Sequence, residues 1–321
     1  MARAVQVAAS VRCHTSPNPW VGCVIVTSDG ETFEGATAVP GGPHAEATAL
    51  GLADTKAGGA TLYTTLEPCS HHGRTPPCSS AVVAAGLRRV VVGIEDPDPL
   101  VAGRGITELR AAGIQVAVGI LADEVTEQLR PYLTHRRTGR PFVVLKMAST
   151  LDGRTAAPDG TSQWITSAEA RAAVHQLRAE SDAVCVGAGT VRADNPALTV
   201  RSYPGPNPRR VVLGKAAADA AVHPCLEWDG PLPGLLDHLG AEGVLQLLVE
   251  GGASVAASFH RERLVDRYVM HVAPAFFGGS DARPLFDGPG AATIADLWRG
   301  QFRSSRIVGD DIELVMDRVS A

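Results

Sequence analysis

Short β-branched runs alternate with helical patterns along this chain, and that alternation constrains the fold more than any other feature of the sequence. In the first half, valine-rich runs predict strands, and the segments between them carry the apolar spacing of helices. Strands are expected over residues 21–26, 61–65, 90–94 and 115–118, and helices over 46–52, 79–85 and 106–112. Such alternation is typical of a layered α/β domain.

A second α/β pattern follows a break in the middle of the chain. A long polar helix is expected over 123–136, and the glycine and proline of Thr138-Gly139-Arg140-Pro141 then end it and suit a linker. Beyond it, strands are expected over 143–147, 183–187, 210–213 and 244–249, and helices over 168–180 and 232–239. We therefore predict two domains, residues 1–138 and 142–321.

Composition and charge argue against several classes of function. The net charge of −5 and the scattered Lys and Arg give no basic stripe, so nucleic acid is not an expected partner. No apolar run reaches the roughly 18 residues of a membrane span, and the N-terminus does not have the pattern of a signal peptide. We therefore expect a cytoplasmic protein without a membrane partner, in which the six cysteines are metal ligands or buried side chains rather than disulfides.

One cluster of residues carries a specific chemistry. His44-Ala45-Glu46 precedes a helical run, and Cys69 and Cys78 follow further along the chain. One imidazole and two thiolates suit a catalytic zinc, because three protein ligands leave the fourth position open for water. Glu46 can then carry protons between that water and a departing amino group. A His-x-Glu followed by Pro-Cys and a second cysteine is typical of zinc nucleobase deaminases.

Two other interpretations of this cluster stay open from the residues alone. The cysteines can be buried apolar side chains and His44 a residue at a helix start. Alternatively, the site can be a closed structural zinc in a noncatalytic scaffold, with a fourth ligand from His71 or His72.

The two cysteines are separated by eight residues, where two are usual, and this insert is rich in polar and cationic groups. His71 and Arg74 can bind a phosphate or the edge of a pyrimidine, or they can be solvated loop residues. Asn18 lies between two prolines just before a strand. Its side chain can hydrogen-bond to the edge of the base, or the residue can serve only to form the turn.

Signals in the second half are weaker. The segments 250–254 and 187–190 are rich in glycine and follow strands, so each can hold a cofactor phosphate or form an ordinary tight turn. Neither matches the Gly-x-Gly-x-x-Gly dinucleotide pattern. Lys146 is expected to close a buried strand next to Asp152, either as a strand-end ion pair or as a cation at a reaction centre.

Further motifs accompany the zinc pattern. The first half contains Pro17-Asn18-Pro19-Trp20-Val21-Gly22, a run from Thr65 to Cys78, and Val101-Ala102-Gly103-Arg104-Gly105. The second half contains runs over 146–154, 162–166, 186–194, 250–252 and 272–274. Together these motifs closely resemble the bifunctional deaminase/reductase family of riboflavin biosynthesis, over nearly the whole chain.

The resemblance implies a two-step enzyme. An N-terminal three-layer domain like cytidine deaminase would remove the 2-amino group of 2,5-diamino-6-ribosylamino-4(3H)-pyrimidinone 5′-phosphate. A C-terminal domain like dihydrofolate reductase would then use NADPH to reduce the ribosyl group of 5-amino-6-(5-phosphoribosylamino)uracil to a ribityl chain. It also implies a homo-oligomer, a dimer or a tetramer.

The resemblance also assigns roles to residues. Zinc would be held by His44, Cys69 and Cys78, and the chemistry would involve Glu46, Lys146, Asp194 and Glu250. NADPH contacts are implied for Ala148, Trp164, Thr190, Asp194, Gly252, Ala253, Ser254, Val255, Ala256, Ala257 and Ser258. Substrate contacts are implied for Asn18, His71, Arg74, Ser162, Arg178, Leu198, Arg201 and Glu250, with Arg178 and Arg201 as phosphate ligands because a guanidinium fork suits that anion.

One departure motivates an alternative. The segment between Leu213 and Val249 is shorter than in many members of that family. The alternative function is therefore an active deaminase joined to an inactive or repurposed reductase domain. A nucleic-acid-editing deaminase is a further possibility, which the acidic net charge disfavours.

Overall fold

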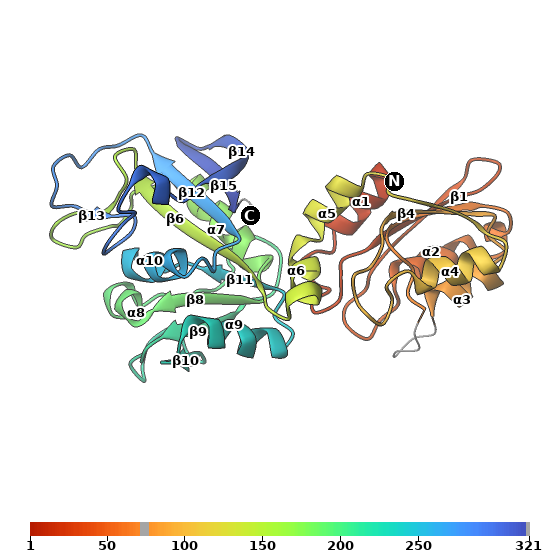
Figure 1. Cartoon of the computed structure of the whole chain (residues 1–321), viewed down its shortest axis with the longest axis horizontal. Helices are drawn as coiled ribbons and strands as arrows, with labels where there is room; N and C mark the ends of the chain where they lie inside the picture. Colours follow the sequence, from red (N-terminus) through yellow and green to blue (C-terminus); the bar gives the residue numbers. More distant parts are fainter. Residues whose placement is uncertain (71–76, 319–321) are drawn as a thin grey trace. The chain divides into compact units, whose positions relative to one another are not determined.

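The computed structural model describes residues 1–70 and 77–318, and the chain forms two compact units, Met1–Arg140 and Pro141–Ala321 (Figure 1). Each unit contains its own sheet and is described by itself. No helix among the described residues is long and apolar enough to cross a membrane.

The first unit is built on a five-stranded sheet in the order β2-β1-β3-β4-β5. Strand β1 pairs antiparallel with β2 and β3, whereas β3, β4 and β5 run parallel. The strands are β1 (Gly22–Val26), β2 (Thr32–Ala36), β3 (Thr61–Leu66), β4 (Arg89–Ile94) and β5 (Gln115–Val118).

Helices cover both faces of this sheet, which gives three layers. Figure 1 shows α1 (Ala2–Ala9) and α5 (Ala122–Gln128) on one face and α2 (Ala45–Ala53), α3 (Cys78–Ala84) and α4 (Arg104–Ala111) on the other. A short 3-10 helix, η1 (Asp54–Ala57), follows α2. Close packing of α2 on the sheet depends on Gly35 of β2, because a Cβ there would lie 2.1 Å from the carbonyl oxygen of Ala45.

The prediction of one long helix over 123–136 was wrong. The structure has two helices, α5 and α6 (Arg130–Thr138), with Leu129 between them. Pro131 lies in the first turn of α6, where its missing N–H costs nothing, but the same residue cannot continue a helix from before it.

The second unit contains an eight-stranded sheet in the order β10-β9-β8-β11-β6-β12-β15-β14 and a two-stranded sheet, β13-β7. The strands in the stretch β10-β9-β8-β11-β6-β12 all run parallel to one another. Strands β15 and β14 complete the sheet with antiparallel pairing. The strands are β6 (Phe142–Thr150), β7 (Arg154–Ala156), β8 (Ala183–Gly187), β9 (Arg209–Leu213), β10 (Leu226–Trp228), β11 (Gln246–Val249), β12 (Arg267–Ala273), β13 (Arg283–Pro284), β14 (Gly300–Val308) and β15 (Asp311–Arg318).

Its helices are α7 (Ala168–Ala179), α8 (Ala188–Asp194), α9 (Leu232–Ala241) and α10 (Ala253–Arg261), with a 3-10 turn, η2 (Ile294–Asp296). The short segment between Leu213 and Val249 still forms β10 and α9. The expected strand 143–147 continues to Thr150, so Lys146 lies inside β6 and does not close it.

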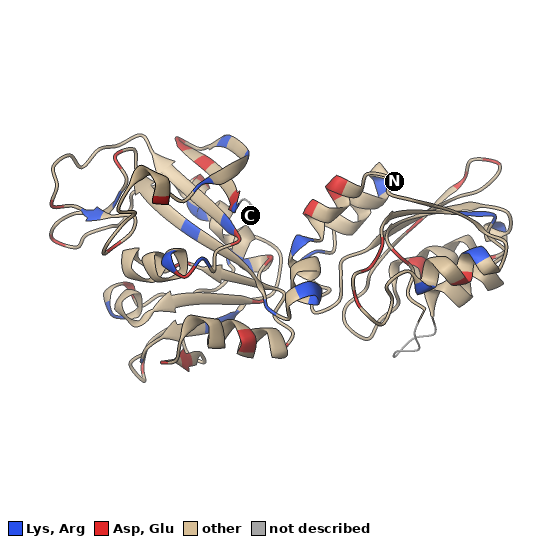
Figure 2. Cartoon of the chain, viewed as in Figure 1, with Lys and Arg blue, Asp and Glu red and all other residues tan. Residues whose placement is uncertain are grey.

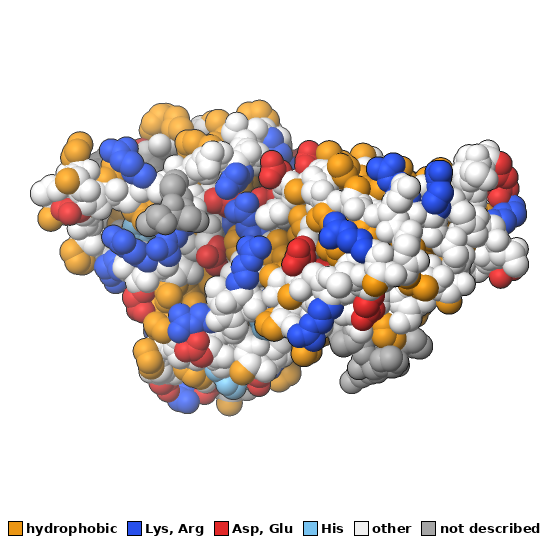
Figure 3. All heavy atoms as spheres, turned by 45° about the vertical axis from the view of Figure 1, so that its right-hand side comes forward, with side chains coloured by type: hydrophobic (Ala, Val, Ile, Leu, Met, Phe, Trp, Pro, Cys, Tyr) orange, Lys and Arg blue, Asp and Glu red, His pale blue; other side chains and the backbone are white. Residues whose placement is uncertain are grey.

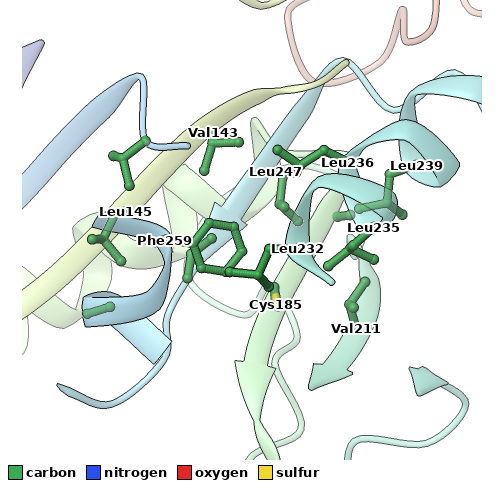
Figure 4. Close-up of a cluster of buried hydrophobic side chains, with 14 of the residues drawn as sticks. Val143, Leu145, Cys185, Val211, Leu232, Leu235, Leu236, Leu239, Leu247 and Phe259 are labelled. Carbon is green, nitrogen blue, oxygen red and sulfur yellow. The ribbon is translucent and has the colours of Figure 1, made fainter. Parts of the chain in front are cut away.

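The core of the second unit forms between α9, α10 and one face of this sheet. Leucines of α9 at helical spacing point toward Val211 and Leu247 of the strands, and Phe259 of α10 is fully buried beside them (Figure 4). Apolar residues at positions i, i+3, i+4 and i+7 lie on one face of a helix, which is the reason α9 buries Leu232, Leu235, Leu236 and Leu239 together.

We predict that Phe259→Ala lowers the free energy of unfolding of the second unit by about 3–5 kcal/mol, because it removes a buried ring and leaves a cavity. Urea unfolding of the full chain measures this change. Phe276→Ala makes the same substitution at a side chain that is 71% exposed, and it should leave the transition nearly unchanged. Equal effects of the two variants would contradict the core assignment.

The contacts of the buried Glu313 carboxylate predict a dependence of stability on pH. Glu313 of β15 accepts from Arg306 at 2.6 Å and lies 3.1 Å from Nε2 of the fully buried His271. Contact with His271, followed by that with Arg306, lowers the pKa of Glu313 to about 2. A carboxyl whose pKa falls on folding stabilises the protein above its unfolded pKa of about 4.3, and that stability is lost as pH falls toward 2.

We therefore expect Glu313→Gln to flatten the fall in thermal midpoint between about pH 4.3 and pH 2, relative to the unmodified chain. Differential scanning calorimetry across that range measures the slope. An unchanged slope would mean that Glu313 has nearly the same pKa in the folded and unfolded chain.

Candidate active sites

The zinc-ligand residues come from the ends of three elements of the first unit. His44 immediately precedes α2, Cys78 is the first residue of α3, and Cys69 follows the end of β3 by three residues. The Nδ1 atom of His44 lies 3.4 Å from each cysteine Sγ, and the three donor atoms all lie within 4.8 Å of one another. The fold therefore brings the three predicted ligands together.

This geometry fits a tetrahedral zinc. With zinc bonds of roughly 2.3 Å to sulfur and 2.0–2.1 Å to nitrogen, two tetrahedral ligand atoms are about 3.5 Å apart, close to the spacing observed. Among the described residues, only these three form a group of metal-binding side chains with such close donor atoms. His71, His72 and Arg74 lie outside the described residues.

A shared proton couples the two cysteine side chains, and it moves their pKa values in opposite directions. The Cys78 thiol donates to the Cys69 sulfur, and His44 also contacts that sulfur, so the pKa of Cys69 falls to about 4. The pKa of Cys78 rises for the same reason, because its proton is shared with Cys69. The backbone N–H of Cys78 also donates to the Cys69 sulfur at 3.4 Å. Cys69 is thus held as a thiolate, which is the form that ligates a metal.

Glu46 lies in the first turn of α2, two residues after His44, and its side chain is buried. The hydroxyl oxygen of Thr64 lies 3.3 Å from Glu46 Oε1. Burial raises the pKa of Glu46 above its usual range. A carboxyl whose pKa moves toward neutrality both accepts and returns a proton readily, which a proton carrier requires.

Asn18 lies in the turn before β1, where its backbone N–H donates to the carbonyl of Thr15 at 2.8 Å. Turn formation is therefore part of its role. Its side chain makes no hydrogen bond to the described residues and is half-buried.

In the second unit, Glu250 follows β11 and forms a bidentate ion pair with Arg178 of α7, at 2.7 and 2.8 Å. Both side chains are about nine-tenths buried. The remaining guanidinium nitrogen of Arg178 donates to the carbonyl of Thr199 at 3.1 Å. The guanidinium fork of Arg178 therefore faces Glu250.

Lys146 of β6 lies near the same pair. Burial lowers its pKa, while the negative charge of Glu250 opposes that fall. Asp152 does not pair with it: this carboxylate accepts from the Thr150 hydroxyl at 2.5 Å and from the Gly278 amide at 2.9 Å. The alternative of an ion pair between Lys146 and Asp152 is thus wrong.

The loop after α8 contains two predicted substrate residues with different settings. Arg201 is exposed, whereas the side chain of Leu198 is buried in the core beside Val212 and Val222. Leu198 also has a φ of 54°, a conformation that costs free energy in a residue with a side chain.

The predicted cofactor residues cluster around the starts of α8 and α10. A Cβ on Gly252 would meet only Thr190 Oγ1, at 3.9 Å, so the two glycine-rich segments lie side by side with room above Gly252. Gly252 and Ser254 are exposed there. The side chains of Ala256 and Ala257 are buried in the core instead. Open backbone at a helix start suits the phosphate of NADPH.

Three further predicted cofactor residues lie at the end of α8, in the loop before α7 and in β6. Asp194 accepts from Gln163 Nε2 at 3.2 Å, which connects α8 to the loop that contains Ser162 and Trp164. Trp164 is 68% exposed, and the guanidinium of Arg171 lies 4.5 Å from its ring centre. Ala148 is half-buried on β6.

Two structural residues near these sites were not assigned from the sequence. Glu67, in the run before Cys69, is buried and accepts three backbone N–H groups. The ring of His175, on α7, lies 3.2 Å from the amide nitrogen of Arg201. In the sequence, only the charge of Glu67 within an apolar run indicates a special role for it. No feature of the local sequence indicates a role for His175.

Family comparisons agree with this division of the chain. Residues 1–94 match the model of the cytidine and deoxycytidylate deaminase zinc-binding region, and residues 141–314 match that of the RibD C-terminal domain. The riboflavin biosynthesis protein RibD of Escherichia coli is 41% identical over 97% of this chain and 96% of its own length. The chain belongs to the RibD family.

Other members of the RibD family match the chain over a similar length. The Mycobacterium tuberculosis protein is 40% identical over 98% of this chain and 95% of its own length. Among solved structures, Acinetobacter baumannii RibD has a TM-score of 0.93 at 37% identity, covering 99% of this chain and 98% of that one. The Thermotoga maritima deaminase/reductase has a TM-score of 0.90 at 34% identity, covering 99% and 97%.

Membership of the RibD family fixes the function in outline. The chain is a bifunctional enzyme of riboflavin biosynthesis, with a zinc-dependent deaminase and an NADPH-dependent reductase. The predicted fold, a cytidine-deaminase-like domain followed by a reductase domain, is confirmed. Nothing in the comparisons favours an inactive or repurposed reductase.

We predict that Cys69→Ala reduces bound zinc from about one equivalent to well below it, because two protein donors remain of the three. Atomic absorption on the purified chain measures the metal content. Cys185→Ala, at a buried cysteine of the second unit, should leave zinc unchanged. Full zinc occupancy in Cys69→Ala would remove this cysteine from the ligand set.

Proposed function

We propose a specific division of labour between the two units. The first unit deaminates 2,5-diamino-6-ribosylamino-4(3H)-pyrimidinone 5′-phosphate, and the second reduces the ribosyl group of the resulting uracil to a ribityl chain. The domain limits are those of the sequence analysis, 1–138 and 142–321. The observation that carries the first assignment is the convergence of His44, Cys69 and Cys78 beside buried Glu46.

In the deaminase, zinc supplies Lewis acidity that makes water a nucleophile near neutral pH. Glu46 takes up the proton of that water and returns it to the departing amino group, a role that its raised pKa favours. Thr64 keeps the carboxyl oriented by its contact at 3.3 Å. Asn18, His71 and Arg74 are our candidates for binding the pyrimidine and its phosphate.

In the reductase, NADPH supplies the hydride. We place it against Ala148, Ser162, Trp164, Thr190, Asp194 and the exposed backbone of 252–255. Arg201 is the candidate phosphate ligand, because it is exposed and its guanidinium is not committed to a buried carboxylate. Arg178 contributes by holding Glu250 in place.

Lys146 and Glu250 are the groups that we propose to hold charge at the reacting carbon. Burial of the Lys146 ammonium lowers its pKa, which makes the proton easier to release than that of a solvated lysine. Glu250 is fixed by two short hydrogen bonds and so presents its carboxylate in one orientation.

The location of the protein in the cell and its oligomeric state are also matters of proposal. We propose that it acts in the cytoplasm as a homo-oligomer, as a dimer or a tetramer. Acidic and basic side chains are both present on each unit (Figure 2), including the face in Figure 3. The partners that we expect are therefore small molecules and further copies of this chain.

Two variants separate the activities. Glu46→Gln should lower ammonia release by about 10²–10⁴-fold, because the proton carrier is removed, while NADPH oxidation with supplied deaminated product stays unchanged. Ammonia is followed with the diaminopyrimidine ribotide as substrate, and zinc content is measured beside it. Normal ammonia release by a zinc-loaded Glu46→Gln protein would exclude Glu46 as the proton carrier.

Glu250→Gln should give the reverse pattern. It breaks a bidentate, nearly buried ion pair and leaves Arg178 uncompensated, so we expect NADPH oxidation to fall by about 10²-fold or more. Ammonia release by the same protein should stay normal and serves as the control for folding. Loss of both activities together would contradict the assignment of one activity to each unit.

A further inference from the structure

The carboxylate of Glu67 lies buried two residues before the zinc ligand Cys69, and no basic side chain pairs with it within residues 1–70 and 77–318. Instead it accepts three backbone N–H groups, from Asp96 at 3.2 Å, Gly103 at 2.9 Å and Ile106 at 3.2 Å. A buried charge is costly unless its oxygens are hydrogen-bonded, and these three donors satisfy both of them.

Two of the three donors belong to the start of α4. Gly103 is its N-cap residue, and Ile106 is the third residue of the helix. Their N–H groups have no partner within the helix, and the positive end of the helix dipole favours an anion there. Glu67 therefore acts as the N-terminal cap of a helix that lies almost forty residues further along the chain.

The same helix touches the metal loop directly. A Cβ on Gly105 would lie 2.0 Å from the carbonyl oxygen of Pro68, so only a glycine allows α4 to approach the residue that precedes Cys69. On its next turn, Glu108 accepts from the hydroxyl of Ser79 at 2.6 Å, one residue after Cys78. Helix α4 thus contacts both cysteine segments.

These contacts explain the glycine motif over 101–105, which the catalytic assignments leave without a role. We propose that Glu67 is a positioning residue of the deaminase: by capping α4, it holds that helix against Pro68 and Ser79, and so fixes the separation of the Cys69 and Cys78 sulfurs. It does not touch the metal. Supporting groups of this kind tune metal affinity because they fix the orientation of the ligands.

The test is Glu67→Gln in the full-length chain. A glutamine has one carbonyl oxygen to offer three N–H donors, and its amide hydrogens oppose at least one of them. We expect zinc affinity, measured by competition with a chromophoric chelator, to fall about 10–100-fold. Hydrogen exchange at the amides of Gly103 and Ile106 should become faster, while NADPH oxidation by the second unit stays unchanged.

The matched control is Glu124→Gln, the same change at an exposed carboxylate in the first turn of α5, and its zinc affinity should equal that of the unmodified chain. Glu67→Asp keeps the charge but shortens its reach, so its zinc affinity should be intermediate. If the deaminase unit of Glu67→Gln does not fold, the zinc affinity of Glu67→Asp is compared with that of the unmodified chain instead.

The proposal is overturned if Glu67→Gln and Glu67→Asp bind zinc as tightly as the unmodified chain and only their thermal midpoint falls. That result would make Glu67 a stabilising residue alone. Zinc affinity is read directly, so this outcome differs from a failure of the proposed deamination, which would leave zinc binding normal and ammonia absent.

Discussion

The triangle of donor atoms from His44, Cys69 and Cys78 is the constraint on which the first unit depends. Its members lie at the start of α2, beyond the end of β3 and at the start of α3, so the site forms only when both helices are seated on the sheet. The backbone contacts at Gly35 and Gly105 then set how closely the helices approach.

The second unit holds charged side chains of both signs close to its apolar core. Arg178 and Glu250 neutralise one another through a bidentate contact, and Lys146 lies near them in the middle of β6. Such a pair is costly to break because each partner would be left buried and unpaired. Arg201, by contrast, is exposed.

Much of the fold could be predicted because most elements carry their signal locally. The expected strands 115–118 and 183–187 have the same bounds in the structure, and α7 differs by one residue. Some of the elements that the periodicity did not indicate depend on pairing. Strand β2 has little apolar character and forms at a sheet edge against β1, and β14 is exposed along most of its length and pairs with β15. A strand that is stabilised mainly by its hydrogen-bonded neighbour need not carry an apolar period of its own.

By itself, the sequence predicted the candidate zinc ligands and Glu46, because a metal requires particular donor atoms and those residue types occur at a characteristic spacing. It could not determine which side chains of a motif face a ligand. Tertiary structure decided that Leu198, Ala256 and Ala257 turn toward the core and that Arg178 faces Glu250. The physical reason is that side-chain direction follows from packing and pairing across the sheet, which only the folded chain brings together.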